Sequence, residues 1–599
     1  MSKEVLLRKD VKDEHKWAIE EIYASNEAFE EDLKALKEKA PILIDYKGKL
    51  HEKKALLSYL KDFETYTRKL ENLYVFASMK SHEDTTNNEQ QVVLSKIAQY
   101  AAEYSAMVSY FVPELLSLDE KTITSYLEDE ELSMYRFYIQ SIVKEKPHVL
   151  SPEKEELLAT FSDSLNAPDD IFSIFTNADM TFSDVLDKDG KAHPLTEGSY
   201  SQYIISKDRV LRENAFKELF KTYGNFKNTL GQTLAASMKT FNLVAKIRNY
   251  SGPIEASLSP NNIPVAVYDN SLDTINEGIS SLHRYVDLKK KLLKLEDLHM
   301  YDLYVPIIDV PDEEISFDEG VKLALEGLKP LGEEYLTIFE NGVKEGWIDI
   351  YENKGKRSGA YSSGAYDTAP YILLNYHGNL RDVSTLVHEM GHSIHSYYAR
   401  KNQPYVYGDY TLFVAEVAST TNEKLLIHYQ IEKEKDPMKK LYLANQELEQ
   451  IRTTVFRQLM FAEFEKVTHE TIQEGTPMTG EDFSALWLDL NKKYFGEDII
   501  VDEEIEIEWA RIPHFYSDFY VYQYATGYAA ASAFAEMILK DGEEAVEKYL
   551  NFLKTGGSNY PVETLKMAGV DMTSKAPLEA TIRRFNELID LIEKEMDKI

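Results

Sequence analysis

The segment His388-Glu389-Met390-Gly391-His392 constrains the fold of this chain more than any other feature of the sequence. Side chains four residues apart share one face of an α-helix, so both imidazoles can reach a single cation there. A zinc ion would lower the pKa of a bound water towards ~7, and Glu389, which need not be a ligand, would take its proton. The neighbouring positions are apolar and predict a buried helix, where an unpaired histidine pair would be costly; they are Leu386, Val387, Met390 and Ile394.

The third ligand decides the type of site, because a catalytic zinc commonly takes three protein ligands and leaves one position for water. The acidic candidates downstream are Asp409, Glu416 and Glu423. Glu416 lies in an apolar run, residues 413–420, that predicts a second buried helix, and a carboxylate there needs a partner. Asp409 falls in a predicted turn. Glu423 is two helical turns beyond Glu416 and either hydrogen-bonds a ligand imidazole or lies on a solvated face. We therefore expect His388, His392 and Glu416 to hold the metal.

The residues around the motif exclude several classes of metallopeptidase. The metzincin pattern requires glycine and a third histidine where this chain has His395 and Tyr398. The Gly-x-Met-Glu-Asn motif of two-histidine, one-glutamate aminopeptidases is absent, and Gly391 disfavours carboxypeptidases with arginine before the second histidine. His395 itself is expected to be a packed or solvent-facing histidine.

The motif, with Glu416 twenty-four residues after His392, resembles the thimet-oligopeptidase-like zinc peptidases and, among them, oligoendopeptidase F. The resemblance is clearest from about residue 200 onwards, and three further stretches carry it: 245–256, 359–376 and 511–527. It implies one zinc per chain and two largely helical lobes that enclose a deep substrate channel. It also implies an endopeptidase whose substrates are short, unfolded oligopeptides.

In the resembled family, a late histidine and tyrosines stabilise the negative charge that develops on the carbonyl oxygen. His514 matches this histidine, and Tyr524 is the tyrosine that fits best. Tyr520, Tyr522 and Tyr528 remain alternatives, and with 40 tyrosines in the chain the cluster could also be ordinary core packing.

Residues 358–376 predict a glycine-rich loop followed by a strand. A peptide substrate can add to such a strand through backbone hydrogen bonds, which are indifferent to its side chains. The alternative is an ordinary glycine-rich turn.

The chain as a whole predicts a mainly α protein with a small β-sheet beside the active site. Helical spacing is plain in residues 29–40 and again after Pro577, whereas strand-like runs are few: 303–310, 371–376 and 405–413. At 599 residues the chain exceeds one simple core. We expect an N-terminal helical region, residues 1–200, and a catalytic region, residues 201–599.

Charge and composition limit the classes of binding partner and the cellular location that we expect. The formal net charge of −35 argues against nucleic acid or an anionic membrane surface as a partner. Zero cysteines exclude thiolate ligands and a disulfide framework, and the N-terminus lacks an apolar signal-like run, so the cytoplasm is the expected location. Two rival functions remain. A metallocarboxypeptidase would need a cation for a terminal carboxylate, and a non-catalytic helical peptide-binding protein would have no need of Glu389.

Overall fold

The chain is mainly helical, with two small sheets, over residues 5–308 and 313–596, which are the residues described by the computed structural model. This confirms the expected mainly α fold. Its contacts divide it into two compact units that alternate along the sequence. Unit 1 comprises residues 1–146, 312–430 and 534–570, and unit 2 comprises residues 147–311, 431–533 and 571–599. The expected boundary near residue 200 stays a prediction, which limited proteolysis would test.

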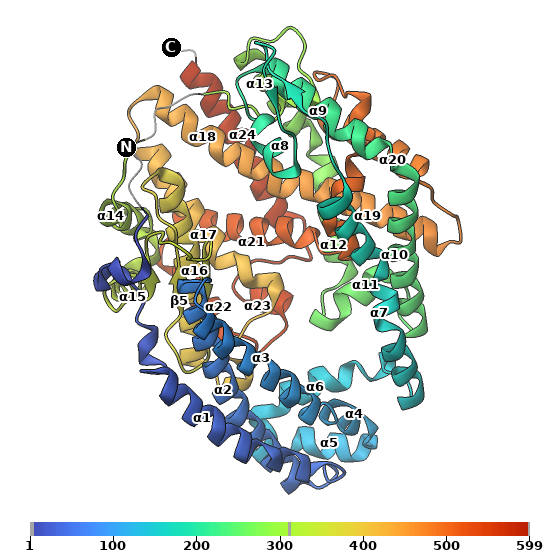
Figure 1. Cartoon of the computed structure of the whole chain (residues 1–599), viewed down its shortest axis with the longest axis vertical. Coiled ribbons are helices and arrows are strands. Elements are labelled where there is room, and N and C mark those ends of the chain that lie inside the picture. Colours follow the sequence, from blue (N-terminus) through green and yellow to red (C-terminus); the bar gives the residue numbers. More distant parts are fainter. Residues whose placement is uncertain (1–4, 309–312, 597–599) are drawn as a thin grey trace. The chain divides into compact units, whose positions relative to one another are not determined.

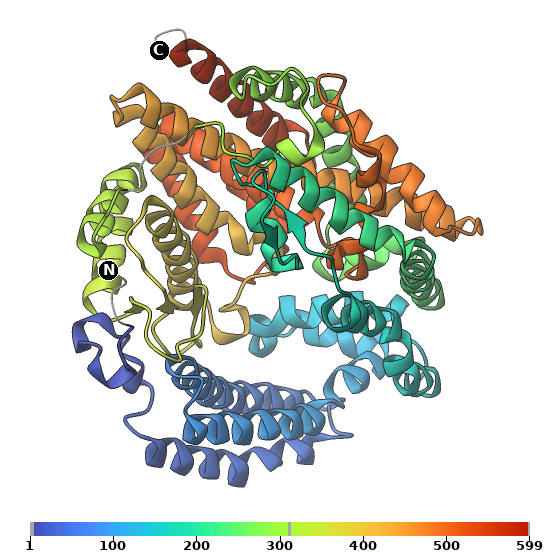
Figure 2. The same ribbon diagram turned by 45° about the horizontal axis from the view of Figure 1, so that its top comes forward.

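Unit 1 contains the N-terminal helices and those around the HEMGH motif (Figure 1). Its helices are α1 (Asn26–Lys39), α2 (Lys53–Glu83), α3 (Asn88–Val108), α4 (Phe111–Ser117), α5 (Glu120–Glu128), α6 (Arg136–Lys144), α14 (Phe317–Gly327), α15 (Gly332–Lys344), α16 (Leu380–Asn402), most of α17 (Leu412–Lys433), α22 (Glu543–Thr555) and α23 (Pro561–Met567). Figures 1 and 2 show α1, α2 and α3 side by side, around a core to which α4–α6 also contribute.

Unit 2 contains the remaining helices. They are α7 (Pro152–Ile174), α8 (Glu197–Tyr203), α9 (Arg209–Gly224), α10 (Lys227–Ile247), α11 (Pro253–Leu258), α12 (Val265–Glu277), α13 (Ile279–Leu292), α18 (Pro437–Ile451), α19 (Arg457–Gln473), α20 (Gly480–Phe495), part of α21 (Tyr522–Asp541) and α24 (Ala576–Met596). Its sheet is a two-stranded antiparallel ribbon of β1 (Val185–Leu186) and β2 (Ala192–His193).

Two helices show how the sequence pattern becomes structure. In α1 the side chains predicted at helical spacing, Phe29, Leu33 and Leu36, are buried, and Ser25 caps the N-terminus by accepting the N–H of Ala28. In α24 Pro577 lies in the first turn, where the missing N–H costs nothing. Both predictions are confirmed.

The sheet of unit 1 has three strands, β3 (Ile348–Asp349), β4 (Tyr361–Ser363) and β5 (Tyr371–Leu373). Its order is β3-β5-β4, with β3 parallel and β4 antiparallel to β5, so β4 is an edge strand. In the register of the antiparallel pair, Ser362 faces Ile372. Strand β5 confirms the predicted strand at 371–376, whereas the predicted glycine-rich loop before it contains the edge strand β4.

Two other strand predictions are wrong. Residues 405–413 form a 3-10 helix, Tyr405–Tyr407, a bend and the start of α17. Pro404 and Gly408 interrupt the run, and the backbone carbonyl of Tyr407 accepts the N–H of Gly557 instead of pairing with a strand. Residues 303–308 form turns after the 3-10 helix Met300–Asp302, and the rest of that run lies outside the described residues.

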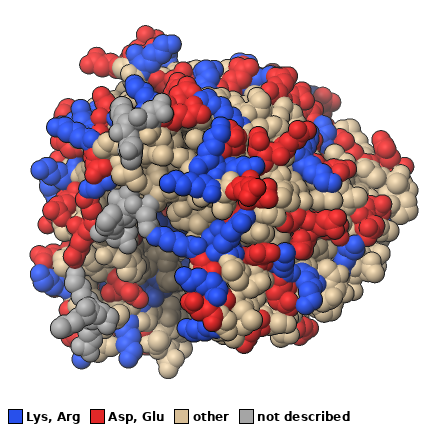
Figure 3. Space-filling view, turned by 90° about the horizontal axis from the view of Figure 1, so that it is seen from above, with Lys and Arg blue, Asp and Glu red and all other residues tan. Residues whose placement is uncertain are grey.

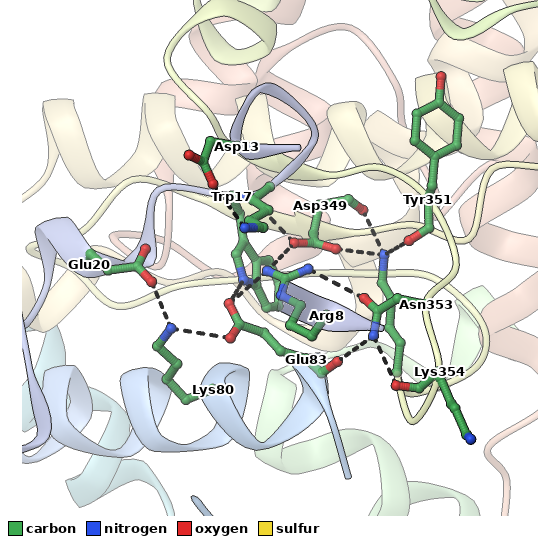
Figure 4. Close-up of polar contacts among 12 residues, drawn as sticks. Arg8, Asp13, Trp17, Glu20, Lys80, Glu83, Asp349, Tyr351, Asn353 and Lys354 are labelled. Carbon is green, nitrogen blue, oxygen red and sulfur yellow. Dashed lines mark hydrogen bonds and ion pairs between the residues drawn. The ribbon is translucent and has the colours of Figure 1, made fainter. Parts of the chain in front are cut away.

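A buried group of charges attaches the N-terminal segment to β3 (Figure 4). The Arg8 guanidinium lies 2.6 Å from Asp349 and 2.8 Å from Glu83, and the indole N–H of Trp17 donates to Glu83 at 2.8 Å. The Lys356 ammonium lies 2.7 Å from the second oxygen of Asp349, whose side chain is 1% exposed. Each buried carboxylate thus faces at least one cation. The cluster ties the N-terminal segment to the sheet that contains β4.

Acidic and basic side chains are interspersed on the face of the molecule seen in Figure 3. Among the described helices, none has both the length and the hydropathy that crossing a lipid bilayer requires.

Candidate metal centre and active site

Helix α16 carries the motif and begins with a strong cap. The Asn379 side chain accepts the N–H of Asp382, and the Asp382 carboxylate in turn accepts the N–H groups of His377, Gly378 and Asn379 at 2.7 to 3.2 Å. Such a reciprocal box satisfies donors that a helix start leaves unpaired. The start of α16, two turns before the first histidine, is thereby fixed.

Gly391 allows α17 to cross α16 at very close range. A Cβ atom built at this position would lie 2.6 Å from the Cα of Ser419 and 2.8 Å from the carbonyl oxygen of Ala418. Any other residue would therefore push α17 away. The glycine between the two histidines is what brings Glu416, one turn before Ser419, to the motif.

The three expected ligands lie together. The Nε2 atoms of His388 and His392 are 3.2 Å apart, and an oxygen of Glu416 lies 3.4 Å from the first and 3.5 Å from the second. A tetrahedral zinc with bonds of ~2.0–2.1 Å needs ligand atoms separated by about 3.3–3.4 Å. The donor set therefore fits zinc, and within the described residues these three side chains form a group that could hold a metal ion.

A further layer of contacts orients these ligands. Glu423 lies 3.4 Å from Nδ1 of His388 and accepts the hydroxyl of Ser384, so it approaches the ring nitrogen that faces away from the triangle. The hydroxyl of Ser419 donates to Glu416 at 2.9 Å. Of the two possibilities for Glu423, the geometry agrees with a contact to a ligand imidazole.

These contacts shift the proton affinities of the group. Burial alone would lower the pKa of His388, but the hydrogen bond and charge of Glu423, followed by the charge of Glu416, raise it to about 9. Burial alone would raise the pKa of Glu416, but the hydrogen bond and charge of His392, with the charge of His388, lower it to about 2. The surrounding carboxylates thus favour a positive charge at the histidine pair, as a cation site requires.

Glu389 differs from the ligands in its environment. The residue is 7% exposed, and desolvation raises the pKa of its carboxyl group above the ordinary value. A raised pKa makes the carboxylate a stronger base, which favours taking a proton from water. Glu389 nevertheless borders the same cavity as both histidines.

That cavity has a volume of about 650 Å³ and lies entirely within unit 1. Its lining combines the metal group, the edge strand β4 and the end of the loop before α17: Ala360, Tyr361, Ser362, Ser363, Gly364, His388, Glu389, His392, Ser396, Arg400, Asp409, Tyr410 and Glu416. The hydroxyls of Ser362 and Ser393 lie 2.8 Å apart and connect β4 to α16. An extended chain beside β4 would therefore pass the metal group.

Ser396, Arg400 and Tyr410 were not anticipated from the sequence. Ser396 and Arg400 follow His392 at intervals of four residues, so helical spacing on α16 was the signal that could have found them. Tyr410 comes from an irregular segment, and only the fold brings it to the cavity. Asp409, the weaker ligand candidate, lines the cavity but lies 3.5 Å from Arg400 and outside the metal group. His395 is packed, with its ring stacked 3.6 Å from that of Tyr410.

The late histidine and tyrosines belong to unit 2, on residues 512–521, which we call the late loop, and on α21. The Tyr524 hydroxyl lies 3.5 Å from Nε2 of His514, and the rings of Tyr520 and Tyr524 meet edge to face at 5.5 Å. Burial lowers the pKa of His514. Tyr522 and Tyr528 are buried in unit 2, so the partly exposed group contains His514, Tyr520 and Tyr524.

Comparisons with known proteins agree with this architecture. A profile of peptidase family M3 matches residues 202–584, and one described as oligopeptidase F matches residues 114–182. Oligopeptidase PepF of Bacillus subtilis is 47% identical over 99% of this chain and 89% of its own, and group B oligopeptidase PepB of Streptococcus agalactiae is 40% identical over 98% of both.

Solved structures extend the likeness to the fold. The crystal structure of oligoendopeptidase-F from Enterococcus faecium has a TM-score of 0.73 at 39% identity and covers 96% of this chain and 100% of its own. That of a Chlamydophila abortus protein has a TM-score of 0.95 at 37% identity, covering 99% and 100%. The chain therefore belongs to peptidase family M3 and is a metalloendopeptidase of the oligopeptidase F type.

Proposed function

We propose that this protein is a zinc-dependent endopeptidase that hydrolyses internal bonds of short, unfolded oligopeptides, with one zinc per chain held by His388, His392 and Glu416. The observation that carries the proposal is the triangle of ligand atoms, with edges of 3.2 to 3.5 Å. The names of the relatives, oligopeptidase and oligoendopeptidase, support the preference for short peptides.

Zinc in this position supplies Lewis acidity, which polarises a carbonyl group and makes water acidic near neutral pH. The carboxylate of Glu389 takes a proton from the attacking water and returns it to the departing amine nitrogen. The raised pKa of its carboxyl group supports this double role, since a proton held too weakly would not reach the leaving group.

The substrate backbone pairs with the outer edge of β4. No other strand occupies that edge among the described residues, and the cavity that β4 lines also contains Glu389 and the histidine pair. Recognition through backbone N–H and C=O groups gives little selectivity for side chains, as a peptidase of mixed oligopeptides needs.

His514 and Tyr524 donate to the oxygen that becomes negative as the peptide bond is attacked, and Tyr520 is the alternative tyrosine. Their mutual contacts and partial exposure support this role. Donors aimed at such an oxygen contribute roughly 10²–10³-fold to kcat. The cytoplasm is the proposed location, which the zero cysteines of the chain support.

The rival carboxypeptidase would need a free cation beside the cavity. Arg400 is the cation that lines it, but this guanidinium donates to the carbonyl of Gly364 at 3.1 Å and faces Asp409 at 3.5 Å. The Nε and Nη1 atoms of Arg400 have no hydrogen-bond partner among the described residues, so Arg400 retains donors for a carboxylate, and the map of cleavage sites decides between the two activities.

The test combines metal analysis with a map of cleavage sites. The purified protein should contain about one zinc per chain, and His388→Ala and Glu416→Ala should each lose zinc and activity. Peptides of one composition and rising length should be cut internally. Full zinc occupancy in both variants would refute the ligand set, and release of single C-terminal residues would favour the carboxypeptidase.

A further inference from the structure

The cavity of unit 1 extends beyond the metal group into a polar end that the proposed mechanism does not use. The lining of this end consists of Ser396 and Arg400 on α16 and of Asp409 and Tyr410 from the segment before α17. The hydroxyl of Tyr410 lies 3.1 Å from that of Ser396 and 3.4 Å from the carbonyl oxygen of His392. The polar end is therefore continuous with the metal group and lies on its C-terminal side along α16.

The guanidinium of Arg400 is the cation of the polar end, and its donors are only partly satisfied. Its Nη2 atom donates to the carbonyl oxygen of Gly364 at 3.1 Å. The Nε and Nη1 atoms are buried and have no hydrogen-bond partner among the described residues. Because an unmet buried donor is costly, a ligand that brings an acceptor to this guanidinium is favoured.

Two carboxyl groups lie near Arg400, and neither supplies an acceptor to the unmet donors. An oxygen of Asp409 lies 3.5 Å from Nη2, but the Asp409 side chain is 81% exposed, so water screens this contact. The carboxyl group of Glu71 instead accepts the hydroxyl of Tyr405 at 2.6 Å, and burial raises the pKa of that carboxyl group. The polar end thus keeps a cation for an incoming negative charge.

Gly364 makes room for the guanidinium beside the edge strand. A Cβ atom built at Gly364 would lie 2.9 Å from Nη1 of Arg400 and 2.8 Å from the carbonyl oxygen of Ala369, which is closer than real Cβ atoms approach. Gly364 directly follows β4, the strand with which the substrate backbone is proposed to pair. A substrate that reaches this end of β4 therefore passes Arg400.

The contacts between β4 and α16 give the direction of the polar end. Ser362 contacts Ser393, the residue after the second histidine. Further along, Gly364 contacts Arg400, so the strand and the helix run in the same direction. Arg400 is eight residues beyond His392, or about 12 Å along the helix axis. An extended chain advances ~3.4 Å per residue and a helical side chain leans back towards the N-terminus, so the guanidinium lies roughly three residues from the cleaved bond.

We propose that Arg400 forms a subsite for a carboxylate of the peptide substrate, roughly three residues from the cleaved bond. The inference rests on the proposed function, because it assumes that a peptide pairs with β4 and is cut at the metal group. A chain antiparallel to β4 runs from Gly364 towards the metal group, so an acidic side chain N-terminal to the cleaved bond reaches Arg400. Parallel pairing would instead bring the C-terminal part of the substrate, with its terminal carboxylate, to the same place.

A charge scan of peptide substrates tests this subsite. Neutral peptides of one length carry a single glutamate at each position in turn, each with a glutamine twin, and a second set compares a free acid with an amide at the C-terminus. Mass spectrometry locates the cleaved bond, while kcat, KM and zinc content are measured for each enzyme. Arg400→Gln removes the charge but keeps an N–H for the Gly364 carbonyl, whereas Arg400→Lys keeps the charge. Lys401→Gln is the control, because Lys401 is exposed and does not line the cavity.

We expect the wild type to prefer the acidic peptide. A glutamate roughly three residues before the cleaved bond should raise kcat/KM about tenfold over its glutamine twin, mainly through KM. Arg400→Gln should reduce this ratio to about one without loss of zinc, Arg400→Lys should keep part of it, and Lys401→Gln should equal the wild type. Asp409→Asn removes the carboxylate that competes for Arg400 and should raise the ratio.

Each outcome decides the matter. Equal cleavage of all twins and of acid and amide peptides, or a preference that persists in Arg400→Gln, overturns the proposal. A preference for the free acid that Arg400→Gln abolishes supports the subsite and assigns parallel pairing. Should Arg400→Gln fail to fold, a raised ratio in Asp409→Asn supports the proposal and an unchanged ratio overturns it.

The failure of the subsite is distinguishable from the failure of the proposed function. Internal cleavage with no charge preference refutes the subsite and leaves the endopeptidase intact. An Arg400-dependent preference together with full zinc occupancy in His388→Ala refutes the ligand set and leaves the subsite standing.

Discussion

Replacing Gly391 with alanine should separate α16 and α17, the two helices that carry the proposed metal ligands. The added Cβ would meet the Cα of Ser419 at 2.6 Å and the carbonyl oxygen of Ala418 at 2.8 Å, whereas ordinary contacts begin at 3.4 Å. Both opposing atoms are backbone, so no side-chain rotation relieves the clash. Helix α17 must retreat by roughly 1 Å, or the fold must bear an overpacking cost of ~1–3 kcal/mol.

The retreat matters because Glu416 moves with α17. Its oxygen now lies 3.4 and 3.5 Å from the two histidine nitrogens, and zinc sites tolerate only about 0.2 Å of error in ligand distance. We therefore expect Gly391→Ala to lose at least tenfold in zinc affinity, an effect of the size that displaced ligand supports produce, roughly 10–100-fold.

Competition with a chromophoric chelator measures this affinity, and thermal unfolding measures the accompanying strain. Gly224→Ala is the matched control, because its Cβ would meet no atom within 4 Å. If Gly391→Ala binds zinc as tightly as the wild type and unfolds at the same temperature, the close crossing of α16 and α17 does not build the site.

Three further predictions concern single groups. Glu389→Gln keeps its size but cannot accept a proton, so zinc content should stay while kcat falls by at least ~10²-fold, and normal turnover would exclude Glu389 as the base. Glu423→Ala should weaken zinc binding by ~10–100-fold in a chelator titration, with Glu423→Gln intermediate because it can still accept a hydrogen bond; equal affinities in all three proteins would exclude the contact to His388. Asp349→Ala leaves the buried Lys356 ammonium without its carboxylate and Arg8 with Glu83 alone, and should destabilise the protein by ~3–5 kcal/mol in urea denaturation, whereas a loss below about 1 kcal/mol would show that water reaches the cluster.

Residue spacing predicted that His388, His392 and Glu416 lie together because these residues belong to regular helices. Two histidines one helical turn apart and a lone glutamate in an apolar run can be recognised from helix periodicity and from the cost of burying polar groups alone. The central strand β5 was likewise predictable, since its aromatic and aliphatic run is a local signal, whereas the edge strand β4 lies in the stretch that was predicted to be a glycine-rich loop.

The wrong strand at residues 405–413 and the unforeseen lining residue Tyr410 share one cause. The aromatic alternation there is local, but the conformation is decided by contacts with residues far away in sequence: Gly557 donates its N–H to the carbonyl of Tyr407, whose hydroxyl accepts from Tyr138. Such pairings, and the close approach of Ser419 to Gly391, depend on tertiary packing, which sequence periodicity does not encode.

The alternation of the two units along the chain has a consequence for how the protein is made. The inner face of α16 is completed by α22: the ring of His395 packs 5.3 Å from that of Phe552, and the side chain of Gln403 donates to the carbonyl of Lys554. Helix α16 ends at Asn402 and α22 begins at Glu543, so a ribosome adding ~5–20 residues per second needs roughly 7–30 s to supply the missing partner. During that interval the nascent chain carries its histidine pair on a helix that cannot yet be fully packed. The helix that carries the histidine pair can therefore complete its packing only when most of the chain has been synthesised.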